Sequence, residues 1–309
     1  MMGCDMRRAV PLAVAVLALT VSPAPAKSFK ELFGDNKYAD AADQSFVESL
    51  DYQQGAIELP AAQTKLTLPA GFYFLSTKDA VRVLVEAWKN PPSAGNGTLG
   101  MIFPADVTPI DGAAWGAQIT FESDGYVSDE DAAAINYDDL LSDMKASTVE
   151  SSKQRVEQGF APIELIGWAS PPYYDSAAHK LHWAKELKFG TEDAHTLNYN
   201  VRVLGRHGVL NINFIAGMNQ VDQIKAAIPA VMTMAELEYG ARYADYVPGT
   251  DKLAAYGIAG LISGVVLKKV GLLGLALVFL QKFWFLGIAA VAGVFTVVRR
   301  LVTRQPPQA

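Results

Sequence analysis

Cysteine is almost absent from this 309-residue chain, since Cys4 is its only one. A single thiol cannot build a disulfide framework, an iron–sulfur cluster or a multi-cysteine zinc site. The motifs that carry a known mechanism are missing as well: the chain has no G-x-S-x-G turn, no G-x-x-x-x-G-K-[ST] loop and no H-E-x-x-H pair. The sequence therefore assigns no catalytic residue, no metal ligand and no cofactor.

Basic residues are also too few to indicate a nucleic-acid-binding protein. The chain has 26 Lys and Arg against 32 Asp and Glu, which gives a formal net charge of −6. Nucleic-acid binding needs a basic face that neutralises phosphates, so we expect no nucleic-acid partner. Half of the residues are hydrophobic, and the longest apolar stretches lie at the two ends of the chain.

The first 26 residues have the three parts of a secretory signal peptide. Two arginines precede an apolar run of 13 residues, 9–21, and small residues occupy positions 24 and 26. This run is too short to span a hydrocarbon core of about 30 Å, which requires ~20 helical residues. We expect residues 1–26 to be removed by cleavage before Lys27. An uncleaved anchor is the alternative.

Residues 283–298 contain no charged residue, begin with three aromatic residues and are followed by Arg299 and Arg300. Aromatic residues at one boundary and arginines at the other are typical of a membrane-spanning helix, and the positive-inside rule places the arginines in the cytoplasm. We therefore expect a transmembrane helix at 283–298 and a cytoplasmic tail at 299–309. The lipid bilayer is the first predicted partner.

Residues 253–280 are harder to place, because Lys268 and Lys269 interrupt them. Gly257, Gly260 and Gly264 have the spacing that lets membrane helices pack closely, although they could also be lipid-facing filler. One interpretation is a Gly-rich helix on or partly inserted in the membrane beside a single span. The other is a second span, which makes a two-pass hairpin. If the glycines pack helices, Gly260→Leu should weaken self-association without disturbing the exported domain.

Residues 27–247 read as one exported domain, joined to the membrane segment by a linker at 248–252. Apolar residues at helical spacing predict helices, and short alternating runs separated by tight turns predict strands. Neighbouring strands joined by hairpins favour an α+β fold with a mainly antiparallel sheet and packed helices. The principal helices are expected at residues 39–50, 137–158 and 220–233, and the principal strands at 98–103, 115–121, 181–189, 197–203 and 210–214.

The turn at residues 205–208 predicts a register for one hairpin. Placing Leu204 opposite Val209 puts the apolar residues of both strands on one face, which the helix at 220–233 would cover. The other face is polar, and it is our candidate binding site. The alternative is the solvated face of a half-buried sheet. With Glu186 of the preceding strand placed opposite Asn200, the candidate residues are Glu186, Asn198, Asn200, Arg202, Asn211 and Asn213.

Two further patterns carry weaker signals. His179 and His182 share a face on a helix but oppose each other on a strand, and the alternation around them predicts a strand, which disfavours a metal site. The aromatic-rich residues 167–174 predict either a binding groove or a Pro-rich loop packed by its own side chains.

Seven short motifs are spread along the chain: LPAGF at 68–72, GWA at 167–169, PPYY at 171–174, LHWA at 181–184, NYNVRVLGR at 198–206, GTDK at 249–252 and AYG at 255–257. Together they resemble a bacterial domain-of-unknown-function family of uncharacterised membrane-anchored proteins, over residues 57–300. The resemblance implies a Gram-negative envelope location with a C-terminal anchor, and it implies no activity, ligand or catalytic residue. The hairpins after Ile163 also resemble the antiparallel sheet of PsbP-like folds.

We expect an inner-membrane protein of a Gram-negative bacterium whose main domain faces the periplasm. The leading hypothesis is a non-enzymatic binding or scaffolding role, with an envelope protein or a second copy of the chain as partner. The alternative is a hydrolase-like enzyme of the cell envelope that uses Glu186 or a histidine. A closed pocket joining Glu186, His182 and Arg202 would favour the enzyme, and a flat solvated sheet would argue against it.

Overall fold

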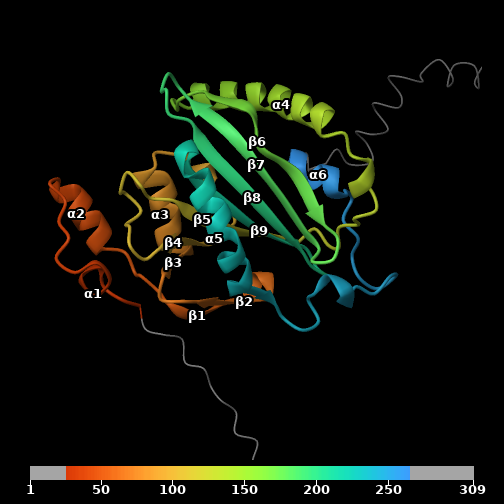
Figure 1. The fold of residues 1–309 in the computed structure, drawn as a ribbon, viewed down its shortest axis with the longest axis horizontal. Helices are drawn as coiled ribbons and strands as arrows, with labels where there is room; N and C mark the ends of the chain where they lie inside the picture. Colours follow the sequence, from red (N-terminus) through yellow and green to blue (C-terminus); the bar gives the residue numbers. More distant parts are fainter. Residues whose placement is uncertain (1–25, 265–309) are drawn as a thin grey trace, which may run out of the picture.

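The structure, a computed structural model, describes residues 26–264 (Figure 1). The predicted transmembrane helix at 283–298, the tail at 299–309, residues 1–25 of the predicted signal peptide and residues 265–280 lie outside the described residues. No helix within residues 26–264 is long and apolar enough to cross a membrane.

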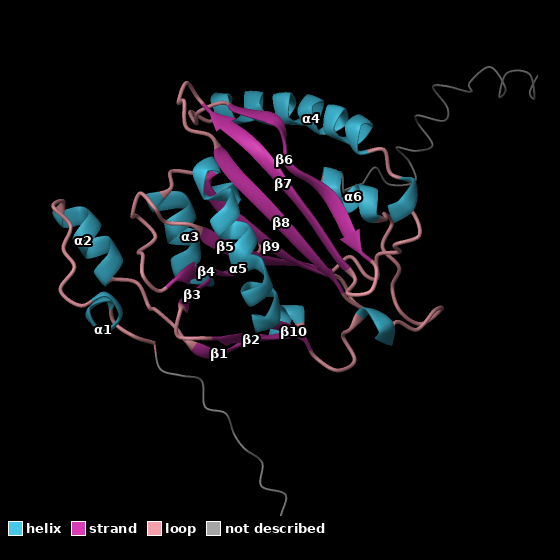
Figure 2. Cartoon of the chain, viewed as in Figure 1, coloured by secondary structure: helices cyan, strands magenta, loops and turns pink. Residues whose placement is uncertain are grey.

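The fold is α+β with antiparallel sheets, as the alternation of apolar residues predicts (Figure 2). A seven-stranded sheet has the order β3-β4-β5-β9-β8-β7-β6, and a small sheet has the order β1-β2-β10. The strands of the large sheet are β3 (Phe72–Ser76), β4 (Thr98–Pro104), β5 (Gly116–Glu122), β6 (Ile163–Asp175), β7 (Lys180–Phe189), β8 (Thr196–Leu204) and β9 (Val209–Gly217). Those of the small sheet are β1 (Gly55–Leu59), β2 (Thr64–Leu68) and β10 (Ala235–Leu237).

The long helices begin and end close to the predicted residues. The amide groups at the start of one of them, α4, are capped by Asn136, whose side chain accepts hydrogen bonds from the amides of Asp138 and Asp139. Another, α5, tolerates Pro229 in its interior. The α-helices of the described chain are α1 (Phe29–Phe33), α2 (Ala41–Glu48), α3 (Thr77–Arg82), α4 (Tyr137–Glu157), α5 (Val221–Met234) and α6 (Ile258–Ser263).

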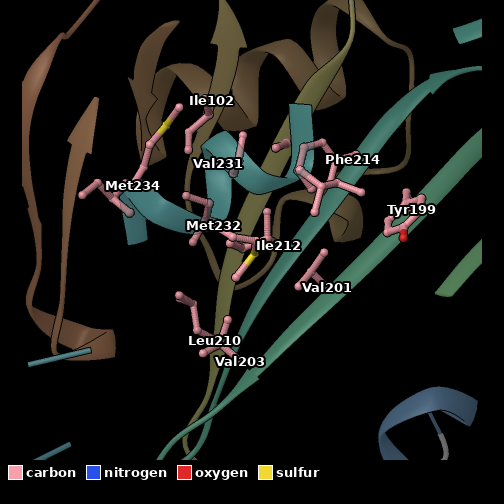
Figure 3. Packing of buried hydrophobic residues seen from close by; sticks show 14 of the residues in the cluster. Ile102, Tyr199, Val201, Val203, Leu210, Ile212, Phe214, Val231, Met232 and Met234 are labelled. Carbon is pink, nitrogen blue, oxygen red and sulfur yellow. The ribbon is translucent and has the colours of Figure 1, made fainter. Parts of the chain in front are cut away.

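One face of the large sheet carries the main apolar core. Leu204 lies opposite Val209, so the predicted hairpin register of β8 and β9 is confirmed. The side chains that this register places on one face, among them Val201 and Ile212, are fully buried. They pack against Val231 of α5, as Figure 3 shows, and the predicted covering role of this helix is confirmed.

The opposite face is covered in two separate parts. At the β3–β4 end, Tyr73 and Phe103 pack with residues of α1, α2 and α3. At the β6–β7 end, Leu181 and Trp183 pack with Met144 of α4 and with α6. Figure 1 shows α4 lying along β6. The middle of this face, over β9 and β8, carries the polar residues of the predicted binding site.

The first residues of the Gly-rich segment belong to the domain. Ile258 of α6 is fully buried with Met144 of α4. A Cβ atom on Gly260 would lie 2.8 Å from the Cβ of Tyr256, so Gly260→Leu would disturb the domain itself, contrary to our expectation. Gly257 and Gly264 flank α6 as its N-cap and C-cap residues. Membrane packing by these glycines stays a prediction, because the chain beyond Gly264 lies outside the described residues.

The aromatic-rich residues 167–174 lie in a strand and not in a loop. They form most of β6, an edge strand of the large sheet. Its pairing with β7 shifts register three times, the last time between Ser170 and Tyr173, where Pro171 and Pro172 lie. Proline is tolerated in a sheet at edge strands and bulges, which is why the two prolines did not mark a loop here.

Candidate functional site

The pairing of β7 with β8 differs from the predicted register, and this removes Glu186 from the candidate site. Glu186 lies opposite Leu197, whereas the prediction placed it opposite Asn200. The difference is three residues, and a shift by an odd number moves a side chain to the other face of the sheet. Glu186 therefore lies on the face of α5, where its Oε1 is 2.5 Å from Nδ1 of His195.

The other five predicted residues do share one face, and β7 adds Trp183 and Lys185 to it. Asn200 pairs with both Asn213 and Trp183, and Asn198 pairs with Lys185. The sequence alone did not indicate the two β7 residues, because Trp183 has the same strand parity as the apolar residues Leu181 and Leu187. We call this group the polar cluster: Trp183, Lys185, Asn198, Asn200, Arg202, Asn211 and Asn213.

The polar cluster is not the solvated sheet face that the sequence left as the alternative. Asn200 is 5 % exposed and Asn211 is 4 % exposed. Lys185, Arg202 and Asn213 are half-buried. Helices α4 and α6 pack on the same face of the sheet, where they contact Trp183 of the cluster.

Polar atoms without a partner are concentrated in the cluster. Within residues 26–264, six buried side-chain nitrogen or oxygen atoms lack a hydrogen bond, and five of them belong to cluster residues. Such an atom costs about 1–3 kcal/mol unless water or a ligand pairs with it. The five atoms are Nε1 of Trp183, Oδ1 of Asn198, Nε of Arg202, Oδ1 of Asn211 and Oδ1 of Asn213.

Within residues 26–264, the two cations of the cluster have no ion-pair partner. The guanidinium of Arg202 lies 4.9 Å from the ring centre of Trp183 and donates to the Val201 carbonyl oxygen at 3.4 Å. No carboxylate of the described chain lies within 4.0 Å of Arg202 or Lys185. Burial, opposed by the charge of Glu122, lowers the pKa of Arg202 to about 10. Burial, reinforced by the charge of Arg202, lowers the pKa of Lys185 to about 8.

Glu122 of β5 sets the orientation of the Asn211 amide. Nδ2 of Asn211 donates to Oε1 of Glu122 at 3.0 Å and lies 3.2 Å from Oγ1 of Thr120. A carboxylate only accepts hydrogen bonds, so this contact identifies the amide nitrogen of Asn211. The unpartnered Oδ1 of Asn211 is therefore an acceptor that needs a donor.

A pocket of about 480 Å³ opens at the end of the polar cluster. Thr196 and Ile215 line it, and each is two residues along its strand from a cluster member, Asn198 or Asn213. Alternate residues of a strand share a face, so the pocket and the cluster lie in sequence along the same face, about 7 Å apart. The pocket is also lined by Trp88, Lys89, Asn90, Ala114, Arg155, Ala161, Phe189, Glu192, Ala194, His195, Ala216 and Gly217.

The histidines do not form the other sites that the sequence suggested. His182 pairs with Val201 on the face of α5, while Arg202 lies on the opposite face, so no pocket joins His182 and Glu186 to Arg202. His179 belongs to a hydrogen-bonded group with Tyr174 and Asp129. The Tyr174 hydroxyl donates to Asp129 at 2.6 Å and lies 3.2 Å from Nδ1 of His179. Within residues 26–264 no group of three or more potential ligands could hold a metal ion.

Residues 51–292 match the family described as "Protein of unknown function (DUF2167)". The chain belongs to this family. The resemblance to a family of unknown function is confirmed, and its bacterial and membrane-anchored aspects stay predictions.

Other known proteins say little about this DUF2167 protein. No curated protein matches its sequence. A solved structure, cyanobacterial PsbP (CyanoP) from Synechocystis sp. PCC 6803, matches with 10 % identity over 59 % of this chain and 91 % of its own. Its TM-score is 0.35, so this likeness carries no conclusion about fold or function.

The geometry of the site in this DUF2167 protein suits binding. The cluster presents two cations without an ion-pair partner among the described residues, several amide oxygens and an indole N–H, next to a pocket. Among the described residues, the histidines make side-chain hydrogen bonds only with Tyr174 and Glu186. A serine or threonine activated by a histidine, the usual arrangement for nucleophilic catalysis, is thus not formed within residues 26–264.

Proposed function

We propose that this DUF2167 protein binds a small polar ligand at the polar cluster and holds it without transforming it. The observation that carries the proposal is the concentration of unpartnered polar atoms in the cluster. Native proteins leave a few buried polar groups unpaired per 100 residues, so six among the described residues is an ordinary number. What stands out is that five of the six lie in one patch. A ligand that supplies the missing donors and acceptors removes this cost.

The pocket supports the proposal by giving the ligand a route to the cluster. Small-molecule sites are concave, mostly apolar and furnished with a few convergent polar groups. The pocket combines the rings of Trp88 and Phe189 with the polar side chains of Thr196 and His195. A ligand in the pocket would meet Asn198 and Asn213 next along the sheet.

We further propose that binding takes place in the periplasm of a Gram-negative bacterium, at the inner membrane. The signal-like residues 1–26 and the apolar residues 283–298 with their flanking arginines support this location. The protein would then hold its ligand close to the bilayer. A second copy of the chain, or another envelope protein, is the macromolecular partner expected of such an anchor.

The enzyme hypothesis has less support. It named Glu186 or a histidine as the catalytic group, and a closed pocket joining Glu186, His182 and Arg202 would have favoured it. Glu186 and His182 lie on the face opposite Arg202, so this pocket does not support it. Glu186 and His195 form a close carboxylate–imidazole pair, but no described serine, threonine or lysine side chain is hydrogen-bonded to either of them.

Native mass spectrometry of the full chain purified from its own membranes tests the binding function. The double variant Asn198→Leu/Asn213→Leu removes two acceptors and keeps the branched shape of the side chain. The exposed Asn36→Leu variant is the matched control. We expect a bound small molecule on the wild type and the control, and none on the double variant. A wild type that carries no ligand, with only ordered waters on the five atoms in a high-resolution crystal structure, would overturn the proposal.

A further inference from the structure

The charge of the polar cluster indicates the class of its ligand. Lys185 and Arg202 lie on adjacent strands and on the same face, and neither has a carboxylate partner among the described residues. Lys185 pairs with Asn198, four residues along β8 from Arg202, and the charge of Arg202 helps to lower the pKa of Lys185. Two like charges in one partly buried site repel each other, and both lose hydration. Such an arrangement is stabilised by an anion between or beside the two cations.

The nearest carboxylate does not take that role. Glu122 is engaged by Nδ2 of Asn211 at 3.0 Å, and the Tyr256 hydroxyl donates to its second oxygen at 3.3 Å. The acid lies at one end of the cluster and makes no ion pair with Arg202. The cation pair therefore stays available to a ligand.

The unpartnered amide oxygens of the cluster indicate a second feature of the ligand, hydrogen-bond donors. Oδ1 of Asn211 is buried, unpartnered and fixed as an acceptor by the contact with Glu122. Asn198 and Asn213 present further unpartnered amide oxygens on the same face. A simple inorganic anion offers acceptors only. A ligand that also carries hydroxyl groups donates to these oxygens.

The pocket next to the cluster is also cationic on balance. It is lined by Lys89 and Arg155, against the single carboxylate of Glu192. Arg155 rests over the rings of Phe160 and Phe189, at 5.8 Å and 5.6 Å, and donates from Nε to the Ala161 carbonyl oxygen. Neither cation of the pocket has an ion-pair partner among the described residues. An anion thus meets favourable charge along its approach.

We propose that the ligand is a hydroxylated anion, a sugar acid or a sugar phosphate. Its carboxylate or phosphate lies against Lys185 and Arg202, and its hydroxyl groups donate to the amide oxygens of Asn198, Asn211 and Asn213. Free and membrane-linked sugars share this headgroup chemistry. The inference rests on the proposed function, since it names the class of ligand for the same cluster.

Titration calorimetry of the full chain with four probes tests the inference: glucuronate, a hexose monophosphate, inorganic phosphate and glucose. We expect glucuronate or the hexose phosphate to bind more tightly than phosphate and glucose. Lys185→Met should weaken that binding by about 10- to 100-fold, the loss expected for a hydrogen bond to a charged group. Lys188→Met, on the same strand but the opposite face, should leave it unchanged.

Each other outcome overturns a defined part of the inference. If glucose binds as tightly as glucuronate, and Lys185→Met binds as tightly as the wild type, the inference that the ligand is an anion is wrong. The proposed binding function is then still supported. If inorganic phosphate binds as tightly as the hexose phosphate, the inference that the ligand carries hydroxyl groups is wrong. If none of the probes binds while native mass spectrometry shows a retained neutral molecule, the ligand class is wrong. If no molecule is retained either, both the ligand class and the proposed function are wrong.

Discussion

Replacing Lys185 with methionine should make the protein more stable. Methionine has a similar length and fills the same space, but it carries no charge. Lys185 is half-buried beside Arg202, and both burial and the charge of Arg202 oppose its ammonium form. Removing the charge also relieves Arg202, so we expect Lys185→Met to raise the free energy of unfolding at neutral pH.

The size of the gain follows from the pKa of Lys185. It falls from 10.5 to about 8 in the folded protein. One pKa unit corresponds to about 1.36 kcal/mol, so the protonated lysine costs the folded state about 3 kcal/mol. Solvent contact of this half-buried side chain reduces the cost, and we expect Lys185→Met to stabilise the protein by about 2 kcal/mol at pH 7.

The pH dependence gives the prediction a second, independent readout. The folded pKa of Lys185 lies below the unfolded one, so between pH 8 and pH 10.5 the unfolded state binds a proton that the folded state has lost. The stability of the wild type therefore rises with pH in this window, and the whole penalty is present below pH 8. The advantage of Lys185→Met should shrink steadily between pH 8 and pH 10.

Urea denaturation of the purified full chain at pH 7 and at pH 9.5 measures both effects. Lys188→Met is the control, because Lys188 lies on β7 opposite Glu164 and should lose at most about 1 kcal/mol. A Lys185→Met variant less stable than the wild type at pH 7 would refute the reasoning. So would an advantage that does not change with pH.

Three further measurements test other parts of the structure. Gly125→Ala should lower the free energy of unfolding by about 2 kcal/mol or more in urea titrations, since Gly125 has φ 108° and a Cβ there would lie 2.3 Å from a backbone oxygen; an unchanged midpoint would contradict this packing. Asp131→Ala should cost about 1 kcal/mol and speed amide exchange in α6, because its carboxylate accepts from two amides of that helix; equal exchange would show that the cap is dispensable. Alkaline phosphatase fused after Val247 should be active and after Gln308 inactive, while activity at both positions would indicate the two-pass hairpin.

The β8–β9 hairpin could be predicted from the sequence because its determinants are local. The turn at 205–208 joins two runs of strictly alternating residues, and only one register places both apolar sets on the same face. Helices α4 and α5 were predictable for the same reason, since the spacing of their apolar residues lies within the segment itself. The membership of five residues in the polar cluster followed from that hairpin.

The position of Glu186 could not be predicted in this way. The loop between β7 and β8, residues 190–195, is too long to impose one register, so the pairing of the strands depends on what their faces contact. In the folded protein Trp183 packs with α4 and α6. This register places Lys185 in the cluster and Glu186 on the opposite face of the sheet. Those contacts join segments far apart in the chain.

The sequence by itself determined the α+β class, the two apolar ends and the alternation that puts asparagines and Arg202 on one face. Only the tertiary structure decided that much of this face is buried and that two cations share it without an ion-pair partner among the described residues. The physical reason is the range of the interactions. Alternation and turn geometry act over a few residues, whereas the surroundings of this face depend on elements far apart in the chain, such as α4 and α6 against Trp183.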